Sequence, residues 1–179
     1  MQTTSQHYDE AIAICKDIFL KKMNDYGTAW RNLRPKSLTD QIFIKAQRIK
    51  SIEEKGIQKI NDAINGEYIG IINYCIIALI QIELYDDARI DIPYKEVESL
   101  YNKYFNQTKK LMEDKNHDYG EAWRDMRMSS ITDLILMKVF RVKQIEDNEG
   151  KTIISEGVDA NYMDMINYSA FALIKSKNQ

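Results

Sequence analysis

The sequence is short of the two residues that most often form turns. Its 179 residues include two prolines and seven glycines, where average usage would give about nine and about thirteen. Many short strands joined by tight turns are therefore not expected, and composition excludes collagen-like and low-complexity disordered chains. The remaining composition, 44% hydrophobic and 29% charged, is that of a globular protein that can bury a core without disulfides.

Other absences narrow the function. The two cysteines, Cys15 and Cys75, lie in apolar surroundings and are expected to be buried free thiols. The two histidines lack the spacing of a zinc site, and no P-loop, dinucleotide-binding or serine-hydrolase motif is present. A net charge of −2 provides no field that attracts a polyanion, so we do not expect duplex nucleic acid as a partner.

The sequence also shows no export or membrane signal. The amino-terminal residues lack a basic region followed by an apolar one, and the longest apolar stretch, residues 69–82, contains Asn73 and Gln81 and is too short to span a bilayer. We therefore expect a soluble, cytoplasmic protein with no membrane partner.

What the sequence does contain is an internal repeat. A shift of 93 residues aligns residues 25–54 with residues 118–147, and 16 of the 30 pairs are identical, where about two are expected by chance. After one extra residue in the second copy, the match resumes at Tyr68 and Tyr162. The sequence thus predicts a first repeat over 1–86, a linker over 87–93 and a second repeat over 94–179, packed together as an internal pseudo-dimer.

Each repeat is expected to contain three helices, which makes the predicted fold class an all-α bundle of two tandem three-helix repeats. The first and third helices are expected over 8–24 and 66–84, and again over 94–116 and 158–176. The second helices are expected to begin at Ser37 and Ser130, where Asp40 and Asp133 complete possible capping boxes.

Each second helix carries two cations on or beside its apolar face. They are Lys45 and Arg48 in the first copy, and Lys138 and Arg141 in the second. An unpaired buried ammonium costs several kcal/mol, so we expect an anion from the protein or from a ligand to face them. Asp164 is one candidate, and the sequence leaves open whether it answers these cations or binds a metal.

The pattern Asp-Tyr-Gly-x-Ala-Trp-Arg-x-x-Arg occurs in both copies. Trp30 and Trp123 could stack on a base, and arginines such as Arg31 and Arg124 could bind phosphate. The structural alternative is that the tryptophans hold the helix junction while Arg31 and Arg124 pair with Asp25 and Asp118.

Acidic residues gather near the start of the last helix. Glu156, Asp159 and Asp164 could bind Mg²⁺ opposite the cations, as phosphoryl chemistry requires. The alternative is an acidic first turn that stabilises the helix dipole.

Together, the stretch from Lys22 to Trp30, its copy from Lys115 to Trp123, the pattern Thr-Asp-x-Ile-x-x-Lys-x-x-Arg and the tripeptide Ile-Asn-Tyr resemble the nucleotide modification associated domain 1 family, long catalogued as a domain of unknown function. The resemblance covers almost the whole chain twice, and it implies a link to nucleotide metabolism or base modification. The helical pattern is also similar to the MazG-like all-α nucleoside-triphosphate pyrophosphohydrolases, in which Glu-x-x-Glu and Glu-x-x-Asp bind Mg²⁺. Glu156-x-x-Asp159 fits the second half of that signature, whereas Lys138 and Arg141 stand where carboxylates of the first half are wanted.

Two hypotheses follow. The first is a Mg²⁺-dependent nucleotide pyrophosphohydrolase-like protein, with Glu156, Asp159 and Asp164 on the metal and Asp118 and Asp164 as catalytic carboxylates. Its small-molecule nucleotide would be bound by Trp123, Arg124, Arg127, Lys138, Arg141 and Asn167, and by Trp30, Arg31, Lys45 and Arg48. The second is a non-catalytic nucleotide-binding or protein-interaction bundle in which the same charges form buried ion pairs. A homo-oligomer is compatible with either.

Overall fold

The computed structural model describes residues 1–56, 61–153 and 155–178, with the backbone alone for residues 61 and 62. Within them the chain forms six α-helices, two short 3₁₀ turns and no strand. The elements are α1 (Thr4–Tyr26), η1 (Ala29–Asn32), α2 (Pro35–Lys55), α3 (Asn61–Glu83), α4 (Tyr94–Tyr119), η3 (Ala122–Asp125), α5 (Met128–Asp147) and α6 (Val158–Lys177). Each repeat is therefore a long helix, a 3₁₀ turn and two further helices, which confirms the all-α prediction.

The matched glycines end the first helix of each repeat. Gly27 and Gly120 follow α1 and α4 with φ angles of 60° and 65°, a region that glycine enters without the steric cost paid by other residues. The chain can therefore reverse at once into the 3₁₀ turn that carries Trp30 or Trp123.

The predicted capping boxes are wrong. Helix α2 begins at Pro35 and α5 at Met128, and neither has a side-chain cap. The amide of Ser37 already donates to a main-chain carbonyl, that of Arg34, because Ser37 lies inside the first turn, which Pro35 can open with its preset φ angle. Asp40 instead forms an ion pair with Lys143 at 3.4 Å.

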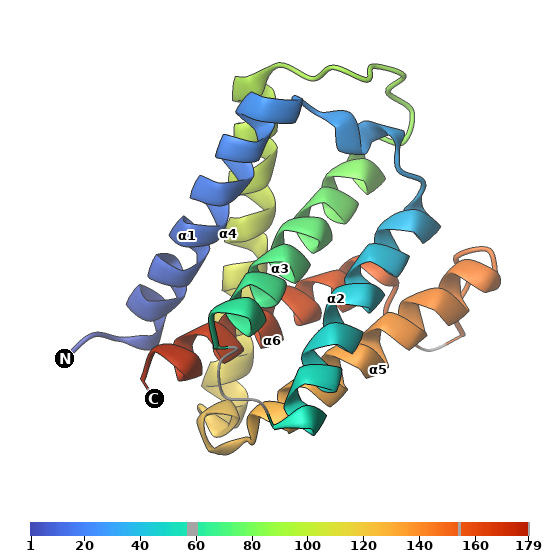
Figure 1. Ribbon diagram of the computed structural model, residues 1–179. Coiled ribbons are helices and arrows are strands. Elements are labelled where there is room, and N and C mark those ends of the chain that lie inside the picture. Colours follow the sequence, from blue (N-terminus) through green and yellow to red (C-terminus); the bar gives the residue numbers. More distant parts are fainter. Residues whose placement is uncertain (57–60, 154, 179) are drawn as a thin grey trace.

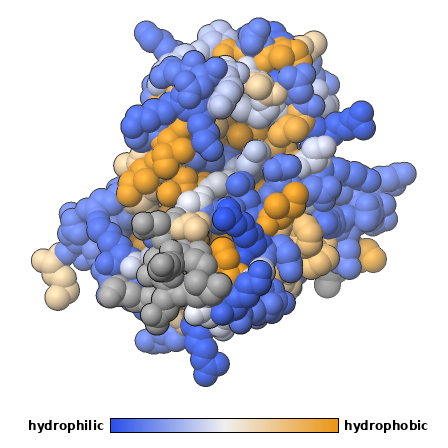
Figure 2. All heavy atoms as spheres, in the orientation of Figure 1, coloured by the Kyte–Doolittle hydropathy of each residue, from blue (hydrophilic) through white to orange (hydrophobic). Residues whose placement is uncertain are grey.

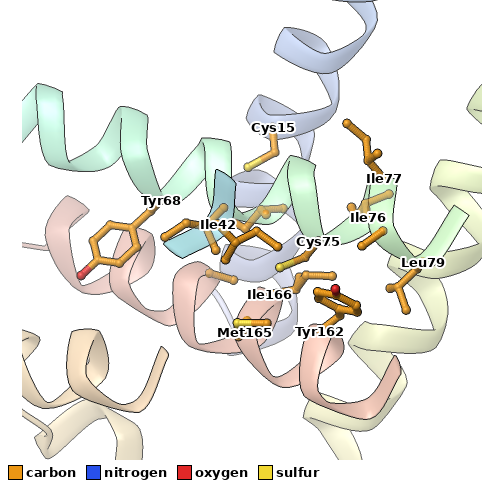
Figure 3. Close-up of a cluster of buried hydrophobic side chains, with 14 of the residues drawn as sticks. Cys15, Ile42, Tyr68, Cys75, Ile76, Ile77, Leu79, Tyr162, Met165 and Ile166 are labelled. Atoms are coloured by element: carbon orange, nitrogen blue, oxygen red, sulfur yellow. The ribbon is translucent and has the colours of Figure 1, made fainter. Parts of the chain in front are cut away.

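The helices form three layers, and each layer contains the equivalent helix from both repeats. Helices α1 and α4 pack side by side, α3 packs against α6 in the centre, and α2 packs against α5 on the other side (Figure 1). The core is shared by the layers: Cys15 of α1, Ile42 of α2, Cys75 of α3 and Met165 of α6 all belong to one buried cluster (Figure 3). Both cysteines are free and buried, as predicted.

Among the described residues, one helix is long and apolar enough to be a candidate membrane span. It covers Ala63–Glu83, and 56% of its most apolar stretch is buried inside the bundle. The core helix of a bundle meets the same criteria of length and hydropathy, so this helix is weak evidence for a membrane.

Two equivalent tyrosines join the repeats through the core. The Tyr8 hydroxyl of the first repeat donates to Asn167 Oδ1 of the second at 2.7 Å, and the Tyr101 hydroxyl of the second donates to Asn73 Oδ1 of the first at 2.9 Å. Each asparagine also donates from its amide to a main-chain carbonyl in the first helix of its own repeat. The asparagine of the Ile-Asn-Tyr tripeptide thus satisfies buried polar groups in both repeats.

A second symmetric contact joins α2 to α5. Thr39 donates to a carboxylate oxygen of Glu146 at 2.6 Å and lies 2.9 Å from the Tyr162 hydroxyl. Thr132 repeats the arrangement with Glu53 and the equivalent tyrosine of the first repeat. Several residues that the two copies share therefore serve to hold one copy against the other.

Candidate functional site

A cavity of about 580 Å³ opens between α1, α2 and α3 of the first repeat. Its lining is mostly apolar and aromatic, with Lys22 and Lys45 as the cationic groups. Hydrophobic atoms reach the surface where these three helices meet, among hydrophilic surroundings (Figure 2). A concave apolar site with a few polar groups is the usual form of a small-molecule site.

The aromatic side of the cavity is built by the turn after α1. Gly27 reverses the chain, and η1 then places Trp30 on the cavity wall, with its ring 6.5 Å from that of Phe19. The ring of Tyr74 on α3 also lines the cavity, with Lys45 Nζ 5.7 Å from its centre. The half-buried indole of Trp30 is therefore held beside open space.

The anion that the sequence predicted opposite Lys45 and Arg48 is a protein carboxylate. Glu67 of α3 is 9% exposed, and its two oxygens lie 2.6 Å from Arg48 Nη1 and 3.6 Å from Lys45 Nζ. Lys22, on α1, lines the same cavity and forms no ion pair within the described part of the chain. Among the described residues that line the cavity, the charged groups are therefore both cations.

In the second repeat, a carboxylate of the protein itself binds the equivalent lysines. Asp164 accepts from Lys115 Nζ at 2.7 Å and from Lys138 Nζ at 2.8 Å, one lysine on each carboxylate oxygen. These lysines are the counterparts of Lys22 and Lys45. Because Asp164 and Lys138 are both buried, the pair satisfies two charges that would be costly alone.

The tryptophan of the second repeat is also covered. The Phe171 ring stacks on Trp123 with 4.2 Å between the ring centres and 5° between the planes. The guanidinium of Arg124 lies 4.4 Å from the Trp123 ring centre. In the first repeat, the position of Phe171 is occupied by Ile77, which lines the cavity beside Trp30.

The arginines of the turn segments are already engaged. Arg31 bonds Gln81 and main-chain carbonyls of the linker, including that of Arg89 at 2.9 Å. Arg124 pairs with Glu121 at 2.7 Å and donates to Thr4 at 2.6 Å. The alternative that these arginines pair with Asp25 and Asp118 is therefore wrong: Arg31 holds the linker, and Arg124 ties the second repeat to α1.

The remaining predicted residues lie away from the cavity. Arg127 is the exposed residue preceding α5, and Asp118 is exposed, with its carboxylate 3.3 Å from the neighbouring imidazole of His117. Arg141 is exposed and lines, with Lys138 and Glu156, a second and more polar cavity of about 690 Å³. Of the nucleotide-binding residues predicted for the second repeat, the structure brings Lys138 and Arg141 together in this cavity and places Trp123, Arg124, Arg127 and Asn167 elsewhere.

The carboxylates proposed for Mg²⁺ do not converge. Glu156 and Asp159 are exposed, whereas Asp164 is buried with both oxygens bound to lysines. No group of three histidine, cysteine or acidic side chains in the described ranges is close enough to hold a metal ion. A Mg²⁺ ion needs several oxygen ligands in a near-octahedral arrangement, so this donor set does not fit the ion.

The sequence patterns did not predict a role for Glu67, and they did not assign Lys22 or Lys115 to a site. The signal for the lysines was present, since both stand at the same place before the repeated Asp-Tyr-Gly. The two positions can be found in the aligned third helices, where residues 68–80 and 162–174 differ at six of 13 positions, among them Gly70 against Asp164 and Ile77 against Phe171.

The fold and the cavity define an all-α protein made of two copies of one three-helix unit, of which the first carries an open, cationic and aromatic pocket. The family described as Nucleotide modification associated domain 1 matches the chain twice, over residues 22–82 and 115–175. The chain belongs to this family, with two copies of the domain in tandem. No curated protein and no solved structure matches the chain.

Proposed function

We propose that this protein binds a small-molecule nucleotide in the cavity of the first repeat. The observation that carries the proposal is the placement of the Trp30 ring and of the Lys22 ammonium, which no described carboxylate pairs with, on the walls of one apolar cavity of about 580 Å³. Stacking of a base on an aromatic side chain contributes about 1–3 kcal/mol. Lysine binds phosphate as a compact point charge.

The description of the family supports the same class of ligand, because it associates the domain with nucleotide modification. We propose binding and leave hydrolysis out of the proposal. No carboxylate is among the described residues that line the cavity, and the predicted Mg²⁺ ligands are separated.

Calorimetric titration with nucleoside mono-, di- and triphosphates, with and without Mg²⁺, tests the proposal. The wild-type chain should bind at least one nucleotide, and Lys22→Gln should weaken that binding about tenfold, because one charge-assisted hydrogen bond to phosphate is lost. The matched control is Lys21→Gln. Lys21 is the adjacent, exposed lysine, and it pairs with Asp17.

Binding that is unchanged in Lys22→Gln, or a wild-type chain that binds none of the nucleotides, would refute the proposed site. Pyrophosphate release, measured on the same panel, tests the hydrolase hypothesis separately.

A further inference from the structure

The two repeats hold the same cationic and aromatic groups around their equivalent spaces. The matched pairs are Lys22 and Lys115, Lys45 and Lys138, and Trp30 and Trp123. In the first repeat these groups line a cavity. In the second, the two lysines and the tryptophan contact side chains of α6. The contacting side chains are Asp164 and Phe171, whose counterparts on α3 are Gly70 and Ile77.

We propose that the second repeat is a self-filled copy of the site, in which Asp164 and Phe171 occupy the places that the anionic group and the ring of the ligand take in the first repeat. The inference rests on the proposed nucleotide binding and adds where each part of the nucleotide lies. It also implies one ligand for each chain.

The anionic half of the argument concerns Gly70, the counterpart of Asp164. Asp164 bridges Lys115 and Lys138 with one oxygen on each, at 2.7 and 2.8 Å. Gly70 carries no side chain, and the stem of Lys45 lies across it, with Cδ 2.8 Å from where a Cβ would stand. Lys45 Nζ lies 3.1 Å from that point and 3.6 Å from a Glu67 oxygen, so a ligand phosphate would lie beside Gly70, where it can accept from the Lys45 ammonium and from Lys22 on the same cavity wall.

The aromatic half concerns Ile77, the counterpart of Phe171. Phe171 covers the Trp123 ring by parallel stacking at 4.2 Å. Isoleucine has no ring, and Ile77 and Trp30 both line the open cavity. A planar base can therefore take the stacking position on Trp30 that Phe171 takes on Trp123.

The spacing of the two groups narrows the ligand class. Asp164 and Phe171 are seven residues apart, so they share one face of α6 and are separated by about 10 Å along its axis. A ligand that reproduces them carries its ring and its anionic group on opposite sides of a spacer, as the sugar of a nucleotide does. An acid group attached directly to an aromatic ring is too short.

Exchange of the two positions between repeats tests the proposal by calorimetric stoichiometry. The double variant Gly70→Asp/Ile77→Phe should fill the first cavity and weaken nucleotide binding at least tenfold. The reverse variant, Asp164→Gly/Phe171→Ile, should open the second site and raise the stoichiometry from one to two. Because this second variant breaks a buried ion pair, its fold is checked by circular dichroism, and the first variant tests the proposal independently of it.

Matched controls separate charge from bulk and ring from phosphate. Gly70→Asn adds the same volume without charge and should weaken binding several-fold less than Gly70→Asp. The nucleoside and inorganic phosphate should each bind at least tenfold more weakly than the nucleotide.

Each outcome decides between the two proposals. A wild-type chain that binds two nucleotides, or one whose single site is unaffected by Gly70→Asp/Ile77→Phe, overturns the self-filled copy and leaves nucleotide binding standing. Equal losses for Gly70→Asp and Gly70→Asn overturn the anionic half. A wild-type chain that binds no nucleotide overturns both proposals.

Discussion

At the scale of single residues, the buried charges of this protein are paired within the chain. Asp164 meets two lysines, and Glu67 meets Lys45 and Arg48. The carboxylate comes from different turns of the third helix in the two repeats, because Glu67 corresponds to Asn161 and Asp164 corresponds to Gly70. Each repeat therefore keeps one internal carboxylate, but Glu67 reaches Lys45 and Arg48 and no described carboxylate reaches Lys22, whereas Asp164 reaches both Lys115 and Lys138.

The buried ion pair between Asp164 and Lys138 should be important for stability. Asp164→Asn leaves Lys138 buried without its counter-charge, and the loss of one partner from a buried pair typically costs 3–5 kcal/mol. We expect the free energy of unfolding, measured in urea, to fall by about 3 kcal/mol.

Asp114→Asn is the control, because Asp114 pairs with Lys110 on the surface and should change stability by less than about 1 kcal/mol. Equal effects of the two substitutions would show that the Asp164 pair is not energetically buried.

At the scale of the elements, the contact of α2 with α5 depends on two partly buried glutamates. Each accepts from a threonine of the other repeat, and burial raises the pKa of Glu53 and of Glu146 above the ordinary value. The carboxylates are thus held in an environment that favours their protonated form.

This shift predicts a pH dependence of stability with a definite sign. The folded state binds these protons more tightly than the unfolded state, so the stabilising contribution is complete below the unfolded pKa and is lost as the pH rises through the raised folded pKa. Replacement of both groups, Glu53→Gln/Glu146→Gln, removes the dependence. The difference in unfolding free energy between variant and wild type should therefore shift in favour of the variant from pH 4 to pH 7.

Urea denaturation at several pH values measures this difference. Glu54→Gln, at an exposed neighbouring position, should show no such shift. A difference that is constant with pH, or one that favours the wild type more at pH 7, would contradict the assigned environment.

At the scale of the whole molecule, neither repeat encloses a core of its own. The central layer pairs α3 with α6, and Tyr8 and Tyr101 each bond an asparagine of the other repeat. Separation of the two repeats would expose the apolar faces of α3 and α6, and it would leave the buried tyrosine hydroxyls and asparagine side chains without these partners.

Fragments covering residues 1–86 and 87–179 should therefore not fold as stable monomers. We expect each alone to lose helical signal or to self-associate, and an equimolar mixture to recover helicity as a 1:1 complex. Circular dichroism and size-exclusion chromatography measure both effects. A monomeric fragment with a cooperative unfolding transition would show that the repeats are independent domains.

The repeat, the helical class and the turn glycines could be predicted because each depends on residue patterns within short stretches of the chain. The starts of α2 and α5 were misplaced by two residues, because the backbone opens these helices without the expected serine cap. The predicted roles of Arg31 and Asn167 in ligand binding were plausible by residue type. However, the structure engages both in contacts with segments far away in the chain.

The sequence by itself determined that this protein is two copies of one helical unit, because identity and periodicity are properties of the order of residues. It also indicated the inward lysines, since Lys45 and Lys138 each pair with a carboxylate of the third helix, whereas the prediction was wrong for Arg48 and Arg141, which are exposed. Only the tertiary structure decided which copy is open. That choice depends on contacts such as the one between Lys115 and Asp164, 49 residues apart, which form only once α4, α5 and α6 pack together. The equivalent helices α1, α2 and α3 leave a cavity lined by Gly70 and Ile77, whose counterparts Asp164 and Phe171 contact the lysines and the tryptophan of the second repeat.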